Sequence, residues 1–353
     1  FADIHPPIMG CRYISATIKL SGYVKMESLK SIMVRKHNWL ILATVISILL
    51  LSLVACAPGQ QAEDTSLKMG LLPILDILPF YVAEQKGYFE EEGISVEFVP
   101  VKSAQERDAL MQAGEIDGML NDLISVGLFN RDEAQIKIVA TARRSYPESP
   151  QFRVLTAPDS GISSARDLAG VPIGISQNTV IEYITARMLE AEGLSPDQVE
   201  IVEVSAIPVR FEQLMAGQIQ AATLPDPLAQ GAVAGGANLV VDDSQYTEYS
   251  QSVLSFSRET IASKPSTIEK FLKAWNRAVG DLNSNPEQYS DLLIEKARVP
   301  ESIQGSYRMP PFSEGEVPSQ AEWEDVVDWL LDKGLIDQPI GYEDSVTTDF
   351  TGQ

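Results

Sequence analysis

Cysteine and histidine are almost missing from this 353-residue sequence, which holds only two of each. All four, Cys11, Cys56, His5 and His37, lie within the first 56 residues. The chain beyond residue 56 therefore offers no disulfide, no thiolate nucleophile and no imidazole base. It also lacks the cysteine and histidine ligands on which zinc sites depend. We expect no catalytic residue, no metal site and no cofactor there.

Basic residues are also scarce. The sequence has 27 lysines and arginines against 49 aspartates and glutamates, which gives a net charge of −22. Without the first 55 residues, which hold six basic and two acidic side chains, the net charge is −26. Such a surface repels phosphate backbones and anionic lipid. We therefore exclude nucleic acid as a partner.

One long apolar run occurs, at residues 39–54, directly after the basic pair Arg35 and Lys36. This order is typical of a signal peptide. The run leads into Leu-Val-Ala-Cys at residues 53–56, which resembles the lipobox of bacterial lipoproteins, where the cysteine is lipidated and becomes the new N-terminus. The resemblance implies a signal peptide at 33–55 and a lipid on Cys56. A plain transmembrane anchor is the alternative, and both place the protein outside the cytoplasm.

The segments on either side of this signal receive simpler assignments. Residues 1–32 begin with Phe, so we expect an over-extended reading frame with Met26 or Met33 as the true start. Residues 56–66 are polar and are expected to form a tether.

The first α/β unit is predicted at residues 67–120. Apolar segments at residues 69–72, 94–98 and 116–120 have the length and composition of strands, and the stretches between them have helical signals. Alternation of strands and helices favours a parallel sheet. In open parallel sheets ligands bind beyond the carboxyl ends of the strands.

This rule selects candidate ligand-binding residues in the first unit. Asp76 and Ile77 lie in the loop after the first strand, and Asn121 and Asp122 follow the third. The alternative for Asp122 is that it only caps the helix that follows. Tyr146 lies in a predicted polar loop at residues 141–151 and is a further candidate.

A second unit repeats the first. The segment Ala-Gly-Glu-Ile-Asp-Gly at residues 113–118 is echoed by Ala-Gly-Gln-Ile-Gln-Ala at 216–221, each between a predicted helix and a strand. The echo indicates two lobes of one plan, although chance similarity is an alternative. We expect lobe 1 at residues 67–155 and 256–353 and lobe 2 at 156–255, with crossings near 155 and 255.

The second lobe has two groups of candidate ligand-binding residues. The first, just before a predicted helix, is Ser176, Gln177, Asn178 and Thr179. Polar residues there usually act as N-caps, and the N–H groups of a helix start also attract acceptor groups. The second is Asp226, expected to be the N-cap of a helix that has Pro227 in its first turn.

Several motifs together resemble one family. They are Leu-Pro-Phe-Tyr-Val-Ala at residues 78–83, Lys-Gly-Tyr-Phe at 86–89, and the segments at 92–97 and 113–117. They resemble the substrate-binding proteins of ABC importers for nitrate, sulfonates and thiamine pyrimidines. The family usually has Glu-Pro where this sequence has Asp226-Pro227.

This resemblance implies a bilobal periplasmic-binding-protein fold of type II, in which two α/β lobes joined by two crossings close on a small-molecule solute. It implies a monomer that passes the solute unchanged to the permease and ATPase subunits of the importer. Enzymes of the menaquinone pathway and a pyrimidine synthase resemble the same fold and are the alternative class, as is a sensory binding protein. The pyrimidine synthase relies on histidine and cysteine, which this chain lacks after residue 56.

The ligand is expected to be a nitrogen heterocycle of the aminopyrimidine or flavin kind. Carboxylates at Asp76, Asp122 and Asp226 would accept hydrogen bonds from ring N–H groups, and Phe80, Tyr81 and Tyr146 would stack on a flat ring. An oxyanion such as a sulfonate, taurine or nitrate is the alternative. A carboxylate about 4 Å from an anion costs roughly 4 kcal/mol at an effective dielectric near 20.

The lipid anchor gives the first testable prediction. Mass spectrometry of the wild-type protein should find Cys56 as the first residue and carrying acyl chains, whereas Cys56→Ser should remain unprocessed or unlipidated. An unmodified peptide spanning Ala55 and Cys56 in the wild type would contradict the prediction.

Overall fold

The computed structural model describes residues 63–351. The predictions for residues 1–32, for the signal peptide, for Cys56 and for most of the tether lie outside this part. Among the described helices none is long and apolar enough to cross a membrane.

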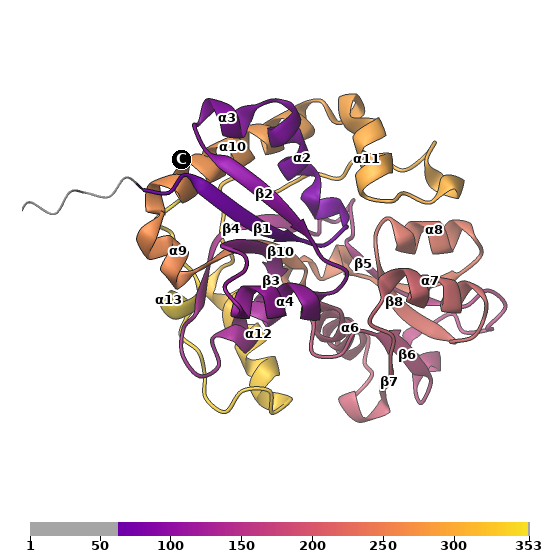
Figure 1. The fold of residues 1–353 in the computed structure, drawn as a ribbon. Helices are drawn as coiled ribbons and strands as arrows, with labels where there is room; N and C mark the ends of the chain where they lie inside the picture. The colour runs from indigo at the N-terminus through magenta and orange to yellow at the C-terminus, as the bar shows by residue number, and fades with distance from the viewer. Residues whose placement is uncertain (1–62, 352–353) are drawn as a thin grey trace, which may run out of the picture. The chain divides into compact units, whose positions relative to one another are not determined.

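The first lobe is built on a five-stranded sheet (Figure 1). Its strands are β1 (Ser66–Leu71), β2 (Ser95–Pro100), β3 (Gly118–Asp122), β4 (Ile136–Arg144) and β10 (Gln251–Ser257), in the order β2-β1-β3-β10-β4. The first three are parallel, as the sequence predicts, but β10 is antiparallel to both β3 and β4. The sheet is mixed, because β10 returns from the second lobe and enters from the opposite end.

Helices of the first lobe cover the sheet with apolar side chains. They are α2 (Leu78–Gln85), α3 (Tyr88–Glu91), α4 (Ala104–Gln112), α5 (Leu123–Phe129), α9 (Arg258–Ser263), α10 (Pro265–Ser284), α11 (Ser290–Lys296), α12 (Gln320–Asp332) and α13 (Tyr342–Ser345), with 3₁₀ turns η1 (Leu75–Ile77), η6 (Pro286–Tyr289) and η7 (Glu301–Ile303). Phe271 and Trp275, one turn apart on α10, are fully buried against Phe80 of α2. This aromatic cluster fixes α2, and hence the loop before it, against the sheet.

The second lobe repeats the strand order of the first. Its sheet runs β7-β6-β8-β5-β9, with strands β5 (Phe152–Thr156), β6 (Pro172–Ile175), β7 (Glu200–Glu203), β8 (Ala221–Pro225) and β9 (Asn238–Asp242). The helices are α6 (Val180–Ala191), α7 (Ile207–Met215) and α8 (Leu228–Ala234), with η2 (Ala165–Leu168) and η3 (Pro196–Gln198). Here too three strands are parallel, and β5 is antiparallel to its neighbours.

The echoed sequence segments occupy equivalent places in the two lobes. Gly114 and Gly217 both have a left-handed φ, 69° and 66°, after the helix that precedes the inner strand. A Cβ on Gly70 of β1 would meet Ile116, and one on Gly174 of β6 would meet Ile219, each at 2.7 Å. The same close packing recurs, so the expectation of two lobes on one plan is confirmed.

The crossings differ from those predicted. β5, which contains Leu155, belongs to the second sheet, and β10, which contains Ser255, belongs to the first. The chain therefore crosses at residues 145–151 and returns at 243–250, which includes η4 (Asp243–Gln245) and η5 (Thr247–Tyr249). The predicted loop at 141–151 is also shorter, because β4 continues to Arg144.

A buried carboxylate ties the two crossings together. Asp243, fully buried on the returning crossing, accepts hydrogen bonds from the backbone N–H groups of Gln151, at 2.8 Å, and Phe152, at 3.2 Å. Ser145 donates its hydroxyl to the carbonyl oxygen of Asp243. The outgoing and returning chains are thus held side by side.

The lobes also touch on each side of these crossings. On one side α6 lies against α12 of the first lobe, where Asp325 accepts hydrogen bonds from the Tyr183 hydroxyl at 2.6 Å and from Arg187 Nε at 2.9 Å. Lys333 pairs with Glu182 at 2.7 Å. These polar contacts fasten the flank of α6 to the first lobe.

On the other side α8 meets the segment before η7 by close packing alone. A Cβ added to Gly231 of α8 would lie 2.6 Å from Cγ of Pro300. A proline ring has little freedom to move aside. Gly231 therefore sets how closely the two lobes approach here.

Substitution of this glycine tests the contact. Alanine in a helix interior is more stable than glycine by up to about 1 kcal/mol, so Gly280→Ala on α10, where a Cβ meets no atom within 4 Å, should raise the free energy of unfolding. Gly231→Ala should lack this gain or lose stability in urea denaturation, and adding Pro300→Ala should restore it. Equal stabilisation by the two single variants would show that the lobes do not meet at Gly231.

Candidate functional site

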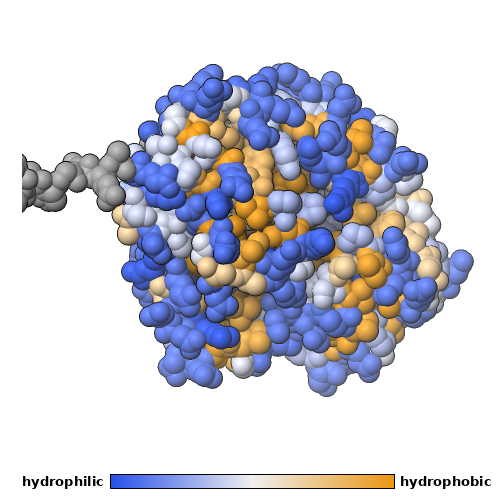
Figure 2. Space-filling view, viewed as in Figure 1, coloured by the Kyte–Doolittle hydropathy of each residue, from blue (hydrophilic) through white to orange (hydrophobic). Residues whose placement is uncertain are grey.

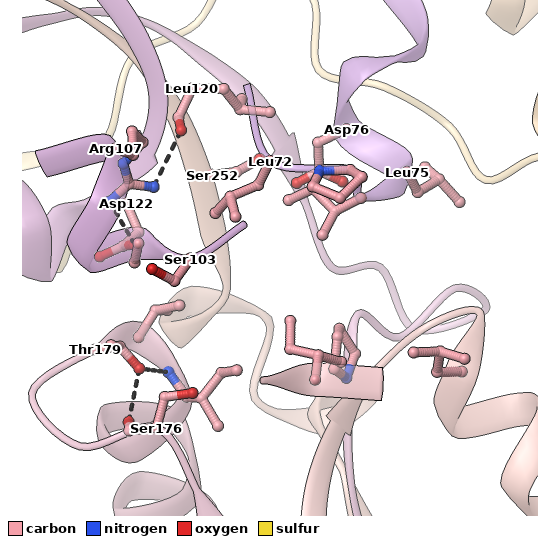
Figure 3. Close-up of a pocket in the computed structure, with 18 of the residues that line it drawn as sticks. Leu72, Leu75, Asp76, Ser103, Arg107, Leu120, Asp122, Ser176, Thr179 and Ser252 are labelled. Atoms are coloured by element: carbon pink, nitrogen blue, oxygen red, sulfur yellow. Dashed lines mark hydrogen bonds and ion pairs between the residues drawn. The ribbon is translucent and has the colours of Figure 1, made fainter. Parts of the chain in front are cut away.

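A cavity of about 580 Å³ lies between the lobes. Both lobes line it, and most of the lining is apolar. Figure 3 shows its walls, with Leu72, Leu75 and Leu120 on the first lobe facing Ser176 and Thr179 on the second. Val101, Phe152, Ile207, Val209 and Leu228 add further apolar surface. This size suits an organic molecule, since small-molecule sites usually measure about 300 to 1,000 Å³.

Asp76 lies in this cavity, as the sequence predicts, but its carboxylate is already paired. It belongs to η1, and its Oδ1 accepts a hydrogen bond at 3.1 Å from Nη1 of Arg143 on β4. The two side chains are only 6% and 3% exposed. Burial by itself lowers the pKa of Arg143, but the neighbouring acidic groups, chiefly Asp76, together outweigh it and raise that pKa above its ordinary value. Arg143 therefore keeps its positive charge in this buried position.

Asn121 and Asp122 line the cavity at the end of β3, and Figure 3 shows Asp122 there beside Arg107. Asp122 is the N-cap of α5, where its Oδ1 accepts the N–H of Ser125 at 2.9 Å. Burial raises the pKa of Asp122, and the nearby charge of Arg107, 4.0 Å from Oδ2, opposes this. Asn121 accepts the hydroxyl of Ser255. A capping role and a place in the cavity therefore coincide at Asp122.

In the second lobe, Ser176 and Thr179 line the cavity but Gln177 and Asn178 do not. Thr179 caps α6 by accepting the N–H of Ile181 and donates its own hydroxyl to the carbonyl of Ser176. Ser176 accepts a hydrogen bond at 3.0 Å from the buried Arg210. The backbone N–H groups of Gln177 and Asn178 are instead bound by Glu203 and Glu182. Only the outer two of the four predicted residues face the cavity.

Asp226 also lines the cavity, yet the N-cap predicted for it is wrong. The N-cap of α8 is Pro227, and no side chain caps this helix. Asp226 instead forms a two-pronged ion pair with Arg153 of β5, in which Nε and Nη2 each donate at 2.9 Å. Neighbouring antiparallel strands β5 and β8 bring the two residues together.

The expected aromatic residues do not line the cavity. Phe80 is buried in the core of the first lobe, and Tyr81 packs edge-on against Phe98. Tyr146 forms a two-residue bridge with Ser149 in the crossing, and the candidate Ile77 is buried in the core. Among the described residues, Phe152 is the one aromatic side chain of the lining. Stacking by Phe80, Tyr81 and Tyr146 is therefore ruled out in this structure.

Sequence reasoning missed the basic side of the site. Lys102, Arg107, Arg143 and Arg298 line the cavity beside its three aspartates. The sequence predicts a polar loop at Arg143. Arg107 falls within a predicted helix, where its sequence neighbours do not distinguish it from a surface arginine. Figure 2 shows a largely hydrophilic face, with apolar residues in patches between. The whole chain has a net charge of −22. The cavity, in contrast, is lined by four basic and three acidic side chains.

Two glutamines complete the polar part of the lining. Gln151 lies at the end of the outgoing crossing and Gln251 at the start of β10, and both are buried. The described lining contains no cysteine or histidine, and within the described residues no group of acidic, cysteine or histidine side chains could hold a metal ion.

Two α/β lobes of equal strand order, joined by two crossings around a cavity, define the type II periplasmic binding protein fold. The structure is similar to the alkanesulfonate-binding protein SsuA of Xanthomonas axonopodis pv. citri bound to MOPS, with a TM-score of 0.69, 18% identity, and coverage of 81% of this chain and 99% of that one. Residues 75–289 match the family described as NMT1/THI5 like, and the chain belongs to this family.

Two characterised relatives align over most of their length. The riboflavin-binding protein RibY of Chloroflexus aurantiacus is 23% identical over 323 residues, covering 83% of this chain and 89% of the relative. The formylaminopyrimidine-binding protein of Halalkalibacterium halodurans is 24% identical over 338 residues, covering 86% and 98%. A further relative, of Brachyspira hyodysenteriae, is named as a putative ABC transporter periplasmic binding protein and is 24% identical over 277 residues, covering 74% of this chain and 78% of the relative. The relatives of this chain thus include substrate-binding components of ABC importers.

The buried Asp243 beneath the cavity predicts a pH dependence. Burial raises the pKa of Asp243 to about 6 from the ordinary 3.8, against the opposing N–H groups of Phe152 and Gln151. A raised pKa means that the folded protein binds this proton more tightly than the unfolded chain, so the contribution of Asp243 to stability grows as the pH falls and is lost as it rises through 6. Between pH 7.5 and pH 5, the wild type should gain about 1 kcal/mol relative to Asp243→Asn in chemical denaturation. The exposed Asp328→Asn should keep the wild-type profile, and an unchanged profile for Asp243→Asn would contradict the assignment.

Proposed function

We propose that this protein is a solute-binding subunit of an ABC importer, held outside the cytoplasm by a lipid on Cys56, and that it binds one small organic molecule between its lobes and delivers it to a permease. One observation carries the proposal, namely the cavity to which both lobes contribute walls. A solute that contacts both lobes favours the state in which they are close together. A permease can then distinguish the loaded protein from the empty one by its shape.

We further propose that the solute is a nitrogen heterocycle of flavin or pyrimidine type. The cavity volume and its apolar walls suit a flat organic ring, and Phe152 offers one aromatic face. Two aligned relatives bear the names of a riboflavin-binding and a formylaminopyrimidine-binding protein. A bare nitrate ion would leave most of such a cavity unfilled.

An organic sulfonate is the second candidate. The observation in its favour is the excess of basic side chains in the lining, since Asp76, Asp122 and Asp226 are each close to an arginine. With these carboxylates neutralised, the repulsion that argued against an anion is much reduced. The like fold of SsuA bound to MOPS shows that this architecture accommodates a sulfonate.

A ligand screen tests the proposal. The purified chain from residue 57 onward should be stabilised by riboflavin, by an aminopyrimidine, or by an organic sulfonate such as hexanesulfonate or taurine, and not by nitrate. A ligand at 100 times its dissociation constant adds about 2.7 kcal/mol of stability, which moves the melting temperature by several degrees.

The same ligand should reduce the radius of gyration in small-angle scattering. Gly231→Ala should weaken binding of that ligand, because it keeps the lobes apart, whereas Gly280→Ala should bind as the wild type does. Absence of binding across the whole panel, or binding with no effect of Gly231→Ala, would count against capture between the lobes.

A further inference from the structure

We infer that Arg143 determines which solutes bind, because it donates two parallel N–H groups to a pair of adjacent hydrogen-bond acceptors on the solute. This inference rests on the proposed function, because it assumes a solute in the cavity between the lobes. It goes beyond that function by naming the recognising group and the ligand feature that it selects.

The guanidinium of Arg143 uses only part of its hydrogen-bonding capacity. Its Nη1 donates to Asp76, while Nε and Nη2 have no hydrogen-bond partner among the described residues. The side chain is 97% buried and lines the cavity at the end of β4. Buried guanidinium N–H groups are almost always satisfied, because an unmet donor costs its lost hydration. A partner that enters the cavity can supply the missing acceptors.

The geometry required is already displayed elsewhere in this protein. Arg153 uses the same edge, Nε and Nη2, to hold both carboxylate oxygens of Asp226 at 2.9 Å. That edge presents two N–H groups side by side, which matches two acceptors on neighbouring atoms. Arg143 offers the equivalent edge, with no protein carboxylate on it.

Two glutamines at the ends of the crossings, Gln151 and Gln251, add further unpaired donors. Gln151 Nε2 and Gln251 Nε2 also lack hydrogen-bond partners among the described residues, and both side chains line the cavity. Gln151 ends the outgoing crossing, and Gln251 begins β10 directly after the returning one. Arg143 and the two glutamines therefore add unpaired donors to the part of the lining that comes from residues next to the crossings.

This arrangement selects a class of ligand. An apolar or flat body would lie between the walls, and its end would carry two adjacent acceptors. A ring carbonyl next to a ring nitrogen, as in a flavin, has this feature, and so has a sulfonate or carboxylate. Asp76 neutralises Arg143, so the acceptor pair can be neutral or charged.

Matched variants separate recognition from structure. Arg143→Lys keeps the positive charge beside Asp76 but cannot present two parallel donors. Arg144→Lys is the control, because Arg144 adjoins Arg143 on β4, pairs with Glu322 and Glu316, and does not line the cavity. Calorimetry with riboflavin and with hexanesulfonate should show affinity about 10- to 100-fold weaker for Arg143→Lys and within twofold of wild type for Arg144→Lys.

Pairs of matched ligands measure a preference that would not change if Arg143 had only a structural role. 5-Deazariboflavin replaces one ring nitrogen acceptor of riboflavin by C–H, and hexan-1-ol replaces the sulfonate of hexanesulfonate. The wild type should prefer the first member of whichever pair it binds, and Arg143→Lys should lose most of this preference. The pair that shows the preference identifies a ring edge or an oxyanion as the source of the acceptors.

Direct observation of the arginine completes the test. In ¹⁵N spectra the Nε–H resonance of Arg143, assigned by its loss in Arg143→Lys, should shift on addition of riboflavin or hexanesulfonate. Ligand binding with no shift and with equal affinity for Arg143→Lys would overturn this inference while leaving the proposed function standing. If neither probe binds, and no member of the wider ligand panel does, both this inference and the proposed function are wrong.

Discussion

The carboxylate of Asp243 holds together the two segments on which the arrangement of the lobes depends. It is fully buried and accepts the N–H groups of Gln151 and Phe152, so the outgoing chain is fixed to the returning one at the base of the cavity. Gln151 and Phe152, whose N–H groups make these hydrogen bonds, both form part of the lining. A carboxylate buried in this way costs hydration, which is why its pKa is raised, and the backbone N–H groups offset part of that cost. Asp243 therefore helps to position residues of the cavity although it does not line the cavity itself.

Pairing of opposite charges determines what the cavity can accept. Asp76 and Asp226 are bound by Arg143 and Arg153, and Asp122 caps a helix near Arg107. Each aspartate would repel an anion if it stood alone, but a bound arginine cancels most of this field at the distances of the cavity. The acidic composition of the chain thus describes its outer surface and its solubility, whereas recognition depends on a few local pairs. Charge averaged over a sequence is a poor guide to the charge within a site.

The parts of the structure that the sequence predicts depend on local signals. The echoed Ala-Gly segments predict two equivalent lobes because a left-handed glycine that ends a helix, as Gly114 and Gly217 do, needs only its neighbours. The cap at Asp122 is local too. The failures depend on distant partners: Asp226 is drawn to Arg153, 73 residues away, and Arg143 to Asp76, 67 residues away. Phe80 and Tyr81 follow Asp76 closely in sequence, yet neither lines the cavity. Phe80 packs against Phe271 and Trp275 of α10, and Tyr81 packs against Phe98 of β2. The antiparallel entry of β5 and β10 could not be read from alternating strands and helices, since it depends on where the chain changes lobe.

The two contacts between the lobes differ in kind, so the two sides of the cavity should separate with unequal ease. On the side of α6, Asp325, Tyr183, Arg187 and the Glu182–Lys333 pair form directional polar bonds. On the side of α8, Gly231 and Pro300 only touch. A rotation that separates the lobes therefore costs least when it pivots along α6 and swings α8 outward. Thr179, at the start of α6, would then move little, whereas Leu228, at the start of α8, would move far. The solute would enter between α8 and Arg298. It would meet the residues of α6 already close to their final positions.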